Sequence, residues 1–312
     1  MKPRGAPEAG QPEALQEILA EVRRIEAQSR VLVSGVMAGG YHSCFRGSGV
    51  EFEEIREFAE GDDPRSIDSS VTAKMGRPFV KVFVEERERS LLFLLDLSAS
   101  MGSREGAWTA RQMAARITAC LALSAHRNDD RVGLLRYGPE VLDFAPPKKG
   151  LDNILRILRD ILQGPAAPGR ARLASALEFA GRSLRRPATI LILSDLLGED
   201  PGEWESPLAL CAKKHELLLL RISPPEPSFR GGGLYAIQDP ETGERRILDL
   251  GSPRVRKALT QAQEAFRRRC DQRLLRHGVE LLDFEIPETP DMDPVVRPIL
   301  SFFRKREKRR RR

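Results

Sequence analysis

The chain has 312 residues, and its 51 Lys and Arg against 45 Asp and Glu give a formal net charge of +6. The last nine residues, Arg304–Arg312, carry eight bases and one acid, and without them 43 basic residues stand against 44 acidic ones. The charge therefore argues against a globally basic nucleic-acid-binding domain, and the short apolar runs argue against a membrane-spanning helix, which needs about 20 apolar residues.

The first segment, residues 1–30, predicts a flexible N-terminus that leads into an amphipathic helix. Residues 1–12 are rich in Pro, Gly and Ala. Apolar residues then recur at the spacing of one helix face. These residues are Leu15, Ile18, Leu19, Val22 and Ile25.

The second segment, residues 31–88, begins with glycine-rich loops and continues with the acidic, turn-rich stretch GVEFEEIREFAEGDDPRSID. The stretch RPFVKVFVEERE that follows alternates in polarity and predicts a strand. Glu60, Asp62 and Asp63 are expected to build a turn and to pair with Arg65, and a second acidic site is the alternative.

The third segment, residues 89–300, alternates apolar strands with helices, which predicts a doubly wound, mostly parallel α/β sheet with helices on both faces. A β-hairpin is expected in the insertion 224–252, around the turn sequence DPETGE. Strands are expected at Leu91–Leu97, Arg131–Tyr137, Val141–Phe144, Ala188–Leu193, Glu216–Ile222 and Val279–Phe284. Helices are expected at Ser103–His126, Leu151–Leu162, Leu173–Leu184, Leu208–His215 and Arg254–His277.

The last segment, residues 301–312, is a basic tail. From Arg304 onward it has no apolar residue to bury. Ordering a backbone costs about 1–2 kcal/mol per residue, so we expect the tail to be disordered.

The stretch LLFLLDLSASM places oxygen-bearing side chains where a buried strand ends. Asp96, Ser98 and Ser100 lie at alternate positions, and Asp195 ends a second apolar strand in LILSDLL. Ligands of open α/β sheets bind at the carboxyl ends of the strands, and hard oxygen donors suit Mg²⁺. The sequence therefore predicts a metal site of these four residues, with simple capping of the next helix by Asp96 and Ser98 as the alternative.

This motif, Asp-x-Ser-x-Ser with a later strand-end Asp, resembles the metal-ion-dependent adhesion site of von Willebrand factor A domains. The order of the acidic stretch, the RPFVKVFVEERE strand and LLFLLDLSASM resembles bacterial domain-of-unknown-function family 58 over roughly Val33–Phe284. In that family Ile-Asp is usually followed by Trp and then Ala-Arg. Here Ser69 follows Ile67-Asp68, and Ala73-Lys74 stands for Ala-Arg.

One residue departs from the adhesion-site pattern. Such sites normally carry a Thr in a stretch like Gly-x-Thr-x-Leu-x-x-Ala-Leu, and the matching stretch GRARLASALEF has Ala171 in its place. The resemblance therefore implies a Mg²⁺ site that lacks one hydroxyl ligand. Either water takes the place of that ligand or the site binds Mg²⁺ more weakly.

The resemblance implies a non-enzymatic protein-interaction module in which a carboxylate of the partner completes the metal site. It also implies an adaptor role, because such proteins are typically encoded beside MoxR-class AAA+ ATPases and are thought to act with them in chaperone-like remodelling or metal-cofactor assembly. The chain has no GxxxxGK[ST] phosphate loop of its own.

Two other functions stay open. One is a Mg²⁺-dependent phosphohydrolase with Asp96 as nucleophile, although such enzymes carry a second Asp where Ser98 stands and no Lys lies near Asp195. The other is binding of nucleic acid or an anionic surface through Arg304–Arg312.

The cysteines are expected to be free thiols. They are widely spaced, without a CxxC pair, and the N-terminus has no apolar signal-peptide core. A cytoplasmic location is therefore expected. The four cysteines are Cys44, Cys120, Cys211 and Cys270.

Overall fold

The structure is a computed structural model that describes residues 16–20, 50–59, 62–85, 89–103, 106–163, 167, 169–225, 233–239 and 243–310. The chain divides into two compact units, residues 46–89 and residues 1–45 with 90–312. None of the helices in the described ranges is long and apolar enough to span a membrane.

The smaller unit is a two-stranded antiparallel sheet of β1 (Val50–Glu57) and β2 (Phe79–Glu85), joined by a 3₁₀ turn and by α2 (Ser69–Met75). Asp68 begins α2, because its Oδ1 accepts hydrogen bonds from the backbone N–H groups of Ser70 and Val71. The acidic, turn-rich stretch contains β1 in its first part, for which no strand was predicted. Its apolar residues Phe52 and Ile55 are three positions apart, and the register of β1 shifts between Phe52 and Glu54, so the stretch lacks the strict alternation that predicts a strand.

The acidic turn of this unit is built differently from the expected pairing with Arg65. Asp62 binds Arg56 through two contacts of 2.7 Å, and the Asp63 carboxylate accepts a hydrogen bond from the backbone N–H of Arg65. Burial opposes the shift, but the hydrogen bond from Arg56 dominates and holds the pKa of Asp62 below its usual value. Asp62 and Asp63 therefore shape the turn, and Glu60 lies outside the described residues.

The larger unit contains a six-stranded sheet in the order β10-β7-β6-β3-β4-β5. All neighbours are parallel except β4 and β5, which are antiparallel. Counted in chain order within this sheet, the arrangement is 3-2-1-4-5-6, the doubly wound order in which the strand sequence reverses beside the first strand. The expected fold class is confirmed. The strands are β3 (Ser90–Asp96), β4 (Arg131–Tyr137), β5 (Val141–Lys148), β6 (Thr189–Ser194), β7 (Glu216–Ser223) and β10 (Glu280–Glu285).

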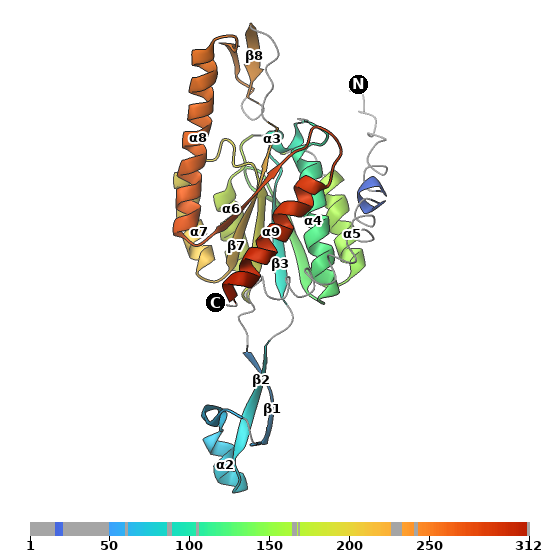
Figure 1. The fold of residues 1–312 in the computed structure, drawn as a ribbon, viewed down its shortest axis with the longest axis vertical. Coiled ribbons are helices and arrows are strands. Elements are labelled where there is room, and N and C mark those ends of the chain that lie inside the picture. Colours follow the sequence, from blue (N-terminus) through green and yellow to red (C-terminus); the bar gives the residue numbers. More distant parts are fainter. Residues whose placement is uncertain are drawn as a thin grey trace, which may run out of the picture. The chain divides into compact units, whose positions relative to one another are not determined.

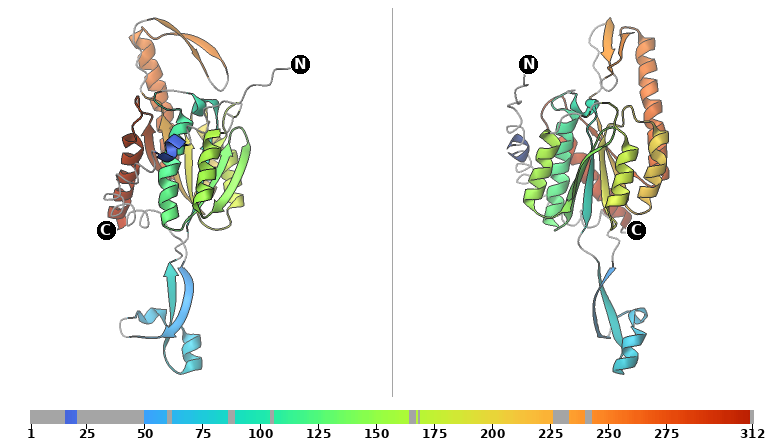
Figure 2. Two further views of the ribbon diagram at one scale, coloured as in Figure 1. Left: turned by 90° about the vertical axis from the view of Figure 1, so that its right-hand side faces the viewer. Right: turned by 180° about the vertical axis from the view of Figure 1, so that it is seen from behind.

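Helices cover both faces of this sheet (Figures 1 and 2). One core lies under α4, α5 and α9, and the other lies under α6, α7 and the C-terminal part of α8. The central strand β3 is buried on both sides, because Leu91, Phe93 and Leu95 enter the first core and Leu92 and Leu94 the second. The helices are α3 (Ala99–Gly102), α4 (Ala110–Arg127), α5 (Leu151–Gln163), α6 (Leu173–Ser183), α7 (Pro201–Ala212), α8 (Pro253–Arg276) and α9 (Asp293–Arg310).

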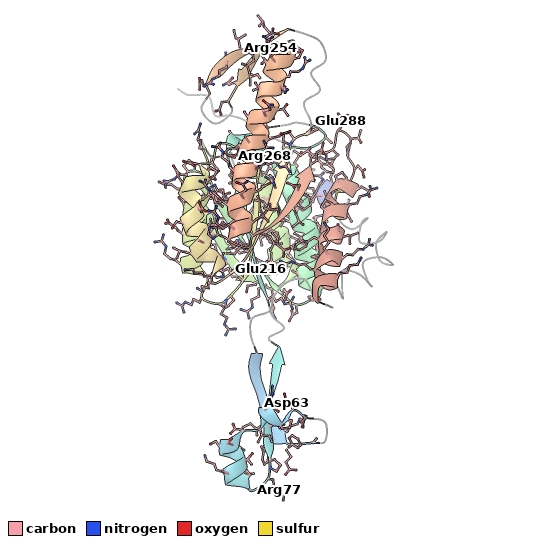
Figure 3. The ribbon with its side chains drawn as sticks, turned by 60° about the vertical axis from the view of Figure 1, so that its left-hand side comes forward. Asp63, Arg77, Glu216, Arg254, Arg268 and Glu288 are labelled. Carbon is pink, nitrogen blue, oxygen red and sulfur yellow. The ribbon has the colours of Figure 1, made fainter. Side chains whose placement is uncertain are left out.

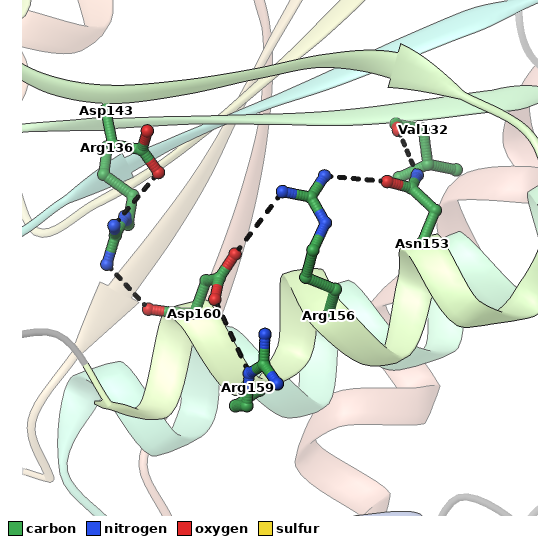
Figure 4. A network of polar contacts seen from close by, with 7 residues as sticks. All are labelled: Val132, Arg136, Asp143, Asn153, Arg156, Arg159 and Asp160. Carbon is green, nitrogen blue, oxygen red and sulfur yellow. Dashed lines mark hydrogen bonds and ion pairs between the residues drawn. The ribbon is translucent and has the colours of Figure 1, made fainter.

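The antiparallel edge strand β5 is tied to α5 by polar contacts (Figure 4). Arg136 of β4 donates to the Asp143 carboxylate at 3.0 Å and to the Asp160 backbone carbonyl at 3.1 Å. Asn153 of α5 donates to the Val132 carbonyl at 2.8 Å. These contacts hold the edge of the sheet in a region where the strand pattern of β5 is partly polar.

The insertion after β7 contains the expected hairpin. Strand β8 (Leu234–Gln238) pairs antiparallel with β9 (Arg245–Asp249), and the two form a separate two-stranded sheet. The chain then enters α8, in which only Cys270 and Leu274 are buried. The hairpin lies beside the N-terminal end of α8, away from the central sheet (Figures 1 and 2).

The structure agrees with the sequence-based expectation at the N-terminal end of the chain and differs from it at the C-terminal end. Residues 16–20 are helical as expected, and Ile18 is buried in the first core, while the rest of the predicted helix lies outside the described residues. The expectation of a disordered tail at 301–312 is wrong for residues 301–310, because α9 continues through Arg310, and the last two residues lie outside the described ranges. Phe302 and Phe303 enter the first core, and Arg306 lies between two carboxylates. These ion pairs help to offset the entropy cost of ordering the C-terminal end of α9, and a search for apolar residues alone does not detect them.

Candidate functional site

The strand-end residues of the predicted site meet where the strand order of the sheet reverses. Strands β3 and β6 are parallel neighbours, with Leu95 opposite Leu193. Asp96 is the last residue of β3, and Asp195 follows the last residue of β6. The carboxyl ends of these two strands form the switch point of a doubly wound sheet, which is where such folds bind ligands.

Asp96 is held in one orientation by two hydrogen bonds. Its Oδ1 accepts the backbone N–H of Ser98 at 2.7 Å, and its Oδ2 accepts the Ser194 hydroxyl at 2.7 Å. The carboxylate is almost completely buried, with 1% of its residue surface exposed. Burial, and to a smaller extent the charge of Asp195, raises the pKa of Asp96 to about 6.

The two serines of the motif do not cap the helix that follows. Ser98 stands at the N-cap position of α3, but its side chain accepts no capping hydrogen bond. Instead its hydroxyl and that of Ser100 lie 3.0 Å apart and share a hydrogen bond. The Ser98 and Ser100 hydroxyls therefore do not cap α3, and they lie beside the carboxylates instead.

Asp195 lies in a tight turn after β6. Its Oδ1 accepts the backbone N–H of Leu197 at 2.8 Å, and the residue between them, Leu196, has a φ of +58°. A non-glycine residue in this left-handed region is uncommon and often marks a functional turn. Burial raises the pKa of Asp195, and the Leu197 N–H and the Ser100 hydroxyl offset part of that shift.

The structure therefore brings all four predicted residues together. The Ser98 and Ser100 hydroxyls share a hydrogen bond. The Ser100 hydroxyl lowers the pKa of Asp195, and the charge of Asp195 raises the pKa of Asp96. Within the described part of the chain, no Lys, Arg or His forms an ion pair with Asp96 or Asp195. The buried Asp96 carboxylate and the half-buried Asp195 carboxylate thus have no neutralising cation from the described residues.

Three further residues belong to this site. Ser194 was adjacent to Asp195 in the sequence, and its fully buried hydroxyl donates to Asp96 and accepts the N–H of Leu196. Glu199 is buried and its Oε1 accepts the backbone N–H of Leu173 at the start of α6. Tyr137 ends β4, and burial together with the charges of Asp96 and Glu199 raises its pKa well above the usual value.

Sequence reasoning missed these three residues for different reasons. Ser194 could have been found from the Ser-Asp pair at a strand end. Tyr137 and Glu199 join the site only through the packing of β4 and of the loop before α7, which no local pattern reveals. The Tyr137 hydroxyl is an unusual feature, because it is buried and has no hydrogen-bond partner among the described residues.

Ala171, the departure from the adhesion-site pattern, lies in the loop before α6. It is buried, with 3% of its surface exposed, and it packs in the second core with Tyr137 and Leu196. The next residue, Arg172, donates its backbone N–H to the carbonyl of Gly138 at 2.8 Å. The loop is therefore anchored next to the end of β4.

The donors at this site fit a hard divalent cation. They are carboxylate and hydroxyl oxygens, the ligands that Mg²⁺ prefers, and an orphaned Tyr137 hydroxyl lies beside them. In the described ranges no group of three or more His, Cys, Asp or Glu side chains gathers as a metal site. A cation here would therefore depend on Asp96 and Asp195 together with hydroxyls and water.

A sequence family matches most of this region. The family described as "Protein of unknown function DUF58" matches residues 54–269. An uncharacterized protein of Mycobacterium tuberculosis is 28% identical over 269 residues, which cover 85% of this chain and 84% of the relative. An uncharacterized protein of Mycobacterium avium is 33% identical over 108 residues, which cover 34% of this chain and 63% of the relative.

Two solved structures are also similar. The conserved hypothetical protein BatB from Bacteroides thetaiotaomicron is 14% identical, with a TM-score of 0.41, over 70% of this chain and 99% of that chain. The SpRpn10 VWA domain is 12% identical, with a TM-score of 0.39, over 68% of this chain and 94% of that chain.

Proposed function

Because this chain belongs to the DUF58 family, we propose that its doubly wound domain is a non-enzymatic protein-interaction module that binds partners through a divalent cation. Asp96, Ser98, Ser100 and Asp195 would hold Mg²⁺, and a carboxylate of the partner would take an open coordination position. The finer proposal is an adaptor role for a MoxR-class AAA+ ATPase in chaperone-like remodelling or cofactor assembly.

One observation carries this proposal. A buried carboxylate, Asp96, and a half-buried one, Asp195, meet at the switch point of the sheet without an ion-paired base among the described residues. Burying a charge without a partner is costly, so such a pair is retained where an external cation neutralises it. Bound Mg²⁺ would supply two positive charges and, because it keeps several waters, positions that a partner oxygen can take.

The first experiment measures metal binding by itself. Calorimetric titration of the full chain with Mg²⁺ should show binding that Asp96→Asn removes. Asn keeps the shape of the buried side chain and one of its two acceptor oxygens, whereas Ala would remove the acceptors of both the Ser98 N–H and the Ser194 hydroxyl. The matched control is Asp152→Asn, an exposed carboxylate in the first turn of α5, which should bind Mg²⁺ as the unmodified chain does.

The second experiment measures partner binding with a purified MoxR-class ATPase from the same genome as the probe. Binding should be lost in Asp96→Asn and kept in Asp152→Asn. The variants decide the outcome, because the ATPase itself needs Mg²⁺ and chelation would disturb both proteins. An ATPase that binds Asp96→Asn as tightly as the unmodified chain would contradict the role of the metal in this interaction.

A further inference from the structure

The β8–β9 hairpin is an exposed arm of the larger unit. It lies at the N-terminal end of α8, where Arg254 is found, while Arg268 is nearer the central sheet (Figure 3). Residues 253–269 of α8 contain no buried side chain. The hairpin therefore stands apart from both hydrophobic cores.

One face of the hairpin carries exposed apolar side chains between Gln238 and Arg245 at one end and Asp249 at the other. Leu234 is 74% exposed and Ile247 is 72% exposed. The register places Ala236 opposite Ile247, and Leu234 is two residues from Ala236, so all three point to the same side of the two-stranded sheet. A two-stranded hairpin on its own is at best marginally stable in water, so pairing of its edge with further strands would stabilise it.

The backbone of β9 also has an unused edge. Asp239 N–H bonds to the Glu244 carbonyl at 2.9 Å, and Leu250 N–H bonds to the Gly233 carbonyl at 3.0 Å. Hydrogen-bonded pairs alternate along an antiparallel ladder, so the backbone groups of three residues of β9 point away from β8. Those residues are Arg245, Ile247 and Asp249.

Most of the backbone polar groups on this edge have no hydrogen-bond partner in the part of the chain that the structure describes. Of the six N–H and C=O groups, only the Asp249 carbonyl is used, by the N–H of Ser252 at 3.2 Å. No other bond of the described residues engages the backbone groups of Arg245 or Ile247 on that side. An edge of this kind is a template for pairing with another strand.

The order of side chains on this edge is complementary to itself. If a second β9 runs antiparallel with Ile247 opposite Ile247, then Arg245 of each copy faces Asp249 of the other. In this register the outward backbone groups of all three residues meet as hydrogen-bonded pairs. A register centred two residues earlier would instead place Arg245 against Arg245, which repels.

We propose that the chain forms a twofold dimer in which β9 of one copy pairs with β9 of a second copy, giving a four-stranded sheet β8-β9-β9-β8. The two apolar faces join into one stripe, with Leu234, Ala236 and Ile247 contributed by each copy. Two Arg245–Asp249 pairs flank the twofold axis. A self-complementary edge is what a twofold interface requires, and an unrelated peptide would need no such symmetry.

The first test is sedimentation equilibrium of the full chain at micromolar concentrations. Pro removes the outward N–H of Ile247 without breaking the β8–β9 ladder, because that N–H does not bond to β8. Ile247→Pro should raise the dimer dissociation constant roughly tenfold or more, since both copies lose a bond. The matched control is Ala236→Pro, whose N–H faces the opposite edge of the hairpin and which should dimerise normally.

A second test does not depend on tolerance of proline. In the proposed register the two Ile247 Cα atoms lie about 5.5 Å apart, within the range for a disulfide. The two Ala236 residues would lie about 14 Å apart, three strand spacings away. Oxidised Ile247→Cys should therefore form a covalent dimer on a denaturing gel, and Ala236→Cys should not exceed the unmodified chain.

The proposal is overturned if the full chain sediments as a monomer or if Ile247→Pro leaves dimerisation unchanged. It is also overturned if Ala236→Pro weakens the dimer as much as Ile247→Pro does, because the interface would then not be the β9 edge. If Ile247→Pro loses its thermal transition, Arg245→Asp replaces it. That variant sets Asp against Asp249 in both pairs and should weaken the dimer by a similar factor.

Discussion

Two pairs of acidic residues lie at opposite ends of the same sheet, and they differ in where their neutralising charge comes from. Glu216 and Glu280 begin β7 and β10, and Arg306 of α9 contacts them at 2.6 Å and 3.0 Å. Glu216 lies at the end of the sheet that is farther from the β8–β9 hairpin and the N-terminal end of α8 (Figure 3). At the other end, Asp96 and Asp195 have no such base among the described residues.

This difference separates a structural cluster from a candidate binding site. Where the chain provides the cation, a partly buried carboxylate pair fixes one element on another, here α9 on the sheet. Where the chain provides none, the repulsion between the carboxylates persists until a ligand relieves it. The following predictions break one pair or sharpen the other.

The largest effect is expected from breaking the Arg306 cluster. The Arg306 side chain is 11% exposed, and it also lies 4.7 Å above the Phe302 ring. Arg306→Met keeps much of the volume but leaves Glu216 and Glu280 without this base, so we expect the free energy of unfolding to fall by about 2–4 kcal/mol. Urea denaturation followed by circular dichroism measures this loss.

Lys305→Met is the matched control for this change. Lys305 is exposed on the same helix, and its replacement should alter stability by less than about 0.5 kcal/mol. Deleting Arg309–Arg312 should likewise be nearly neutral, whereas deleting Arg304–Arg312 should destabilise the fold. Equal stability of the two truncated proteins would show that Arg306 does not anchor α9.

The second prediction concerns the pH dependence of the metal-free protein. The pKa of Asp96 is raised from 3.8 to about 6, so between those values the folded state binds more protons than the unfolded state. Stability from this group therefore falls as pH rises through about 6 and is regained toward pH 4, by about 2–3 kcal/mol. His215 opposes this trend, because burial lowers its pKa from 6.5 to about 4.

The readout is therefore the difference between the unmodified chain and Asp96→Asn, in which the contribution of His215 cancels. The advantage of Asp96→Asn in unfolding free energy should be largest at pH 7 and should shrink toward pH 4. Saturating Mg²⁺ should remove the difference in slope, because the cation favours the ionised carboxylate. A difference that stays constant with pH would mean that Asp96 titrates normally in the folded chain.

The smallest effect is expected at Ala171. Thr at this position would add the hydroxyl that adhesion sites carry and should strengthen Mg²⁺ binding by up to about tenfold, or 1.4 kcal/mol. Ala171→Val is the matched control, because Val has the shape of Thr without the hydroxyl. Calorimetric titration compares them, and equal affinities of the Thr and Val variants would mean that the loop before α6 does not reach the cation.

Most of the larger unit could be predicted from local sequence pattern. The apolar run at Leu91–Leu97 is the central strand β3, as a strand buried on both faces must be apolar throughout. The hairpin of the insertion and the helices α5, α6 and α8 also begin and end close to their expected bounds. Periodicity succeeds here because burial on a regular element repeats at the period of that element.

The residues of the site could also be predicted from the sequence, but its ligand could not. Asp96, Ser98, Ser100 and Asp195 could be named because strand ends of a parallel sheet meet at one edge, so position in the chain implied position in space. Ser194 had a local signal beside Asp195. The metal itself and the partner stay predictions, because the residue types at this edge suit a cation without proving that one binds.

Local pattern was sufficient for the fold class and for the two strand-end aspartates, because both depend on the alternation of apolar strands and helices along the chain. Only the tertiary structure decided that α9 is ordered through Arg310, since its stability depends on Glu216 and Glu280, which are distant in sequence. It also placed Tyr137 beside Asp96 and left the edge of β9 open. Contacts between distant segments leave no periodic trace in the sequence, so they emerge only when the chain is folded.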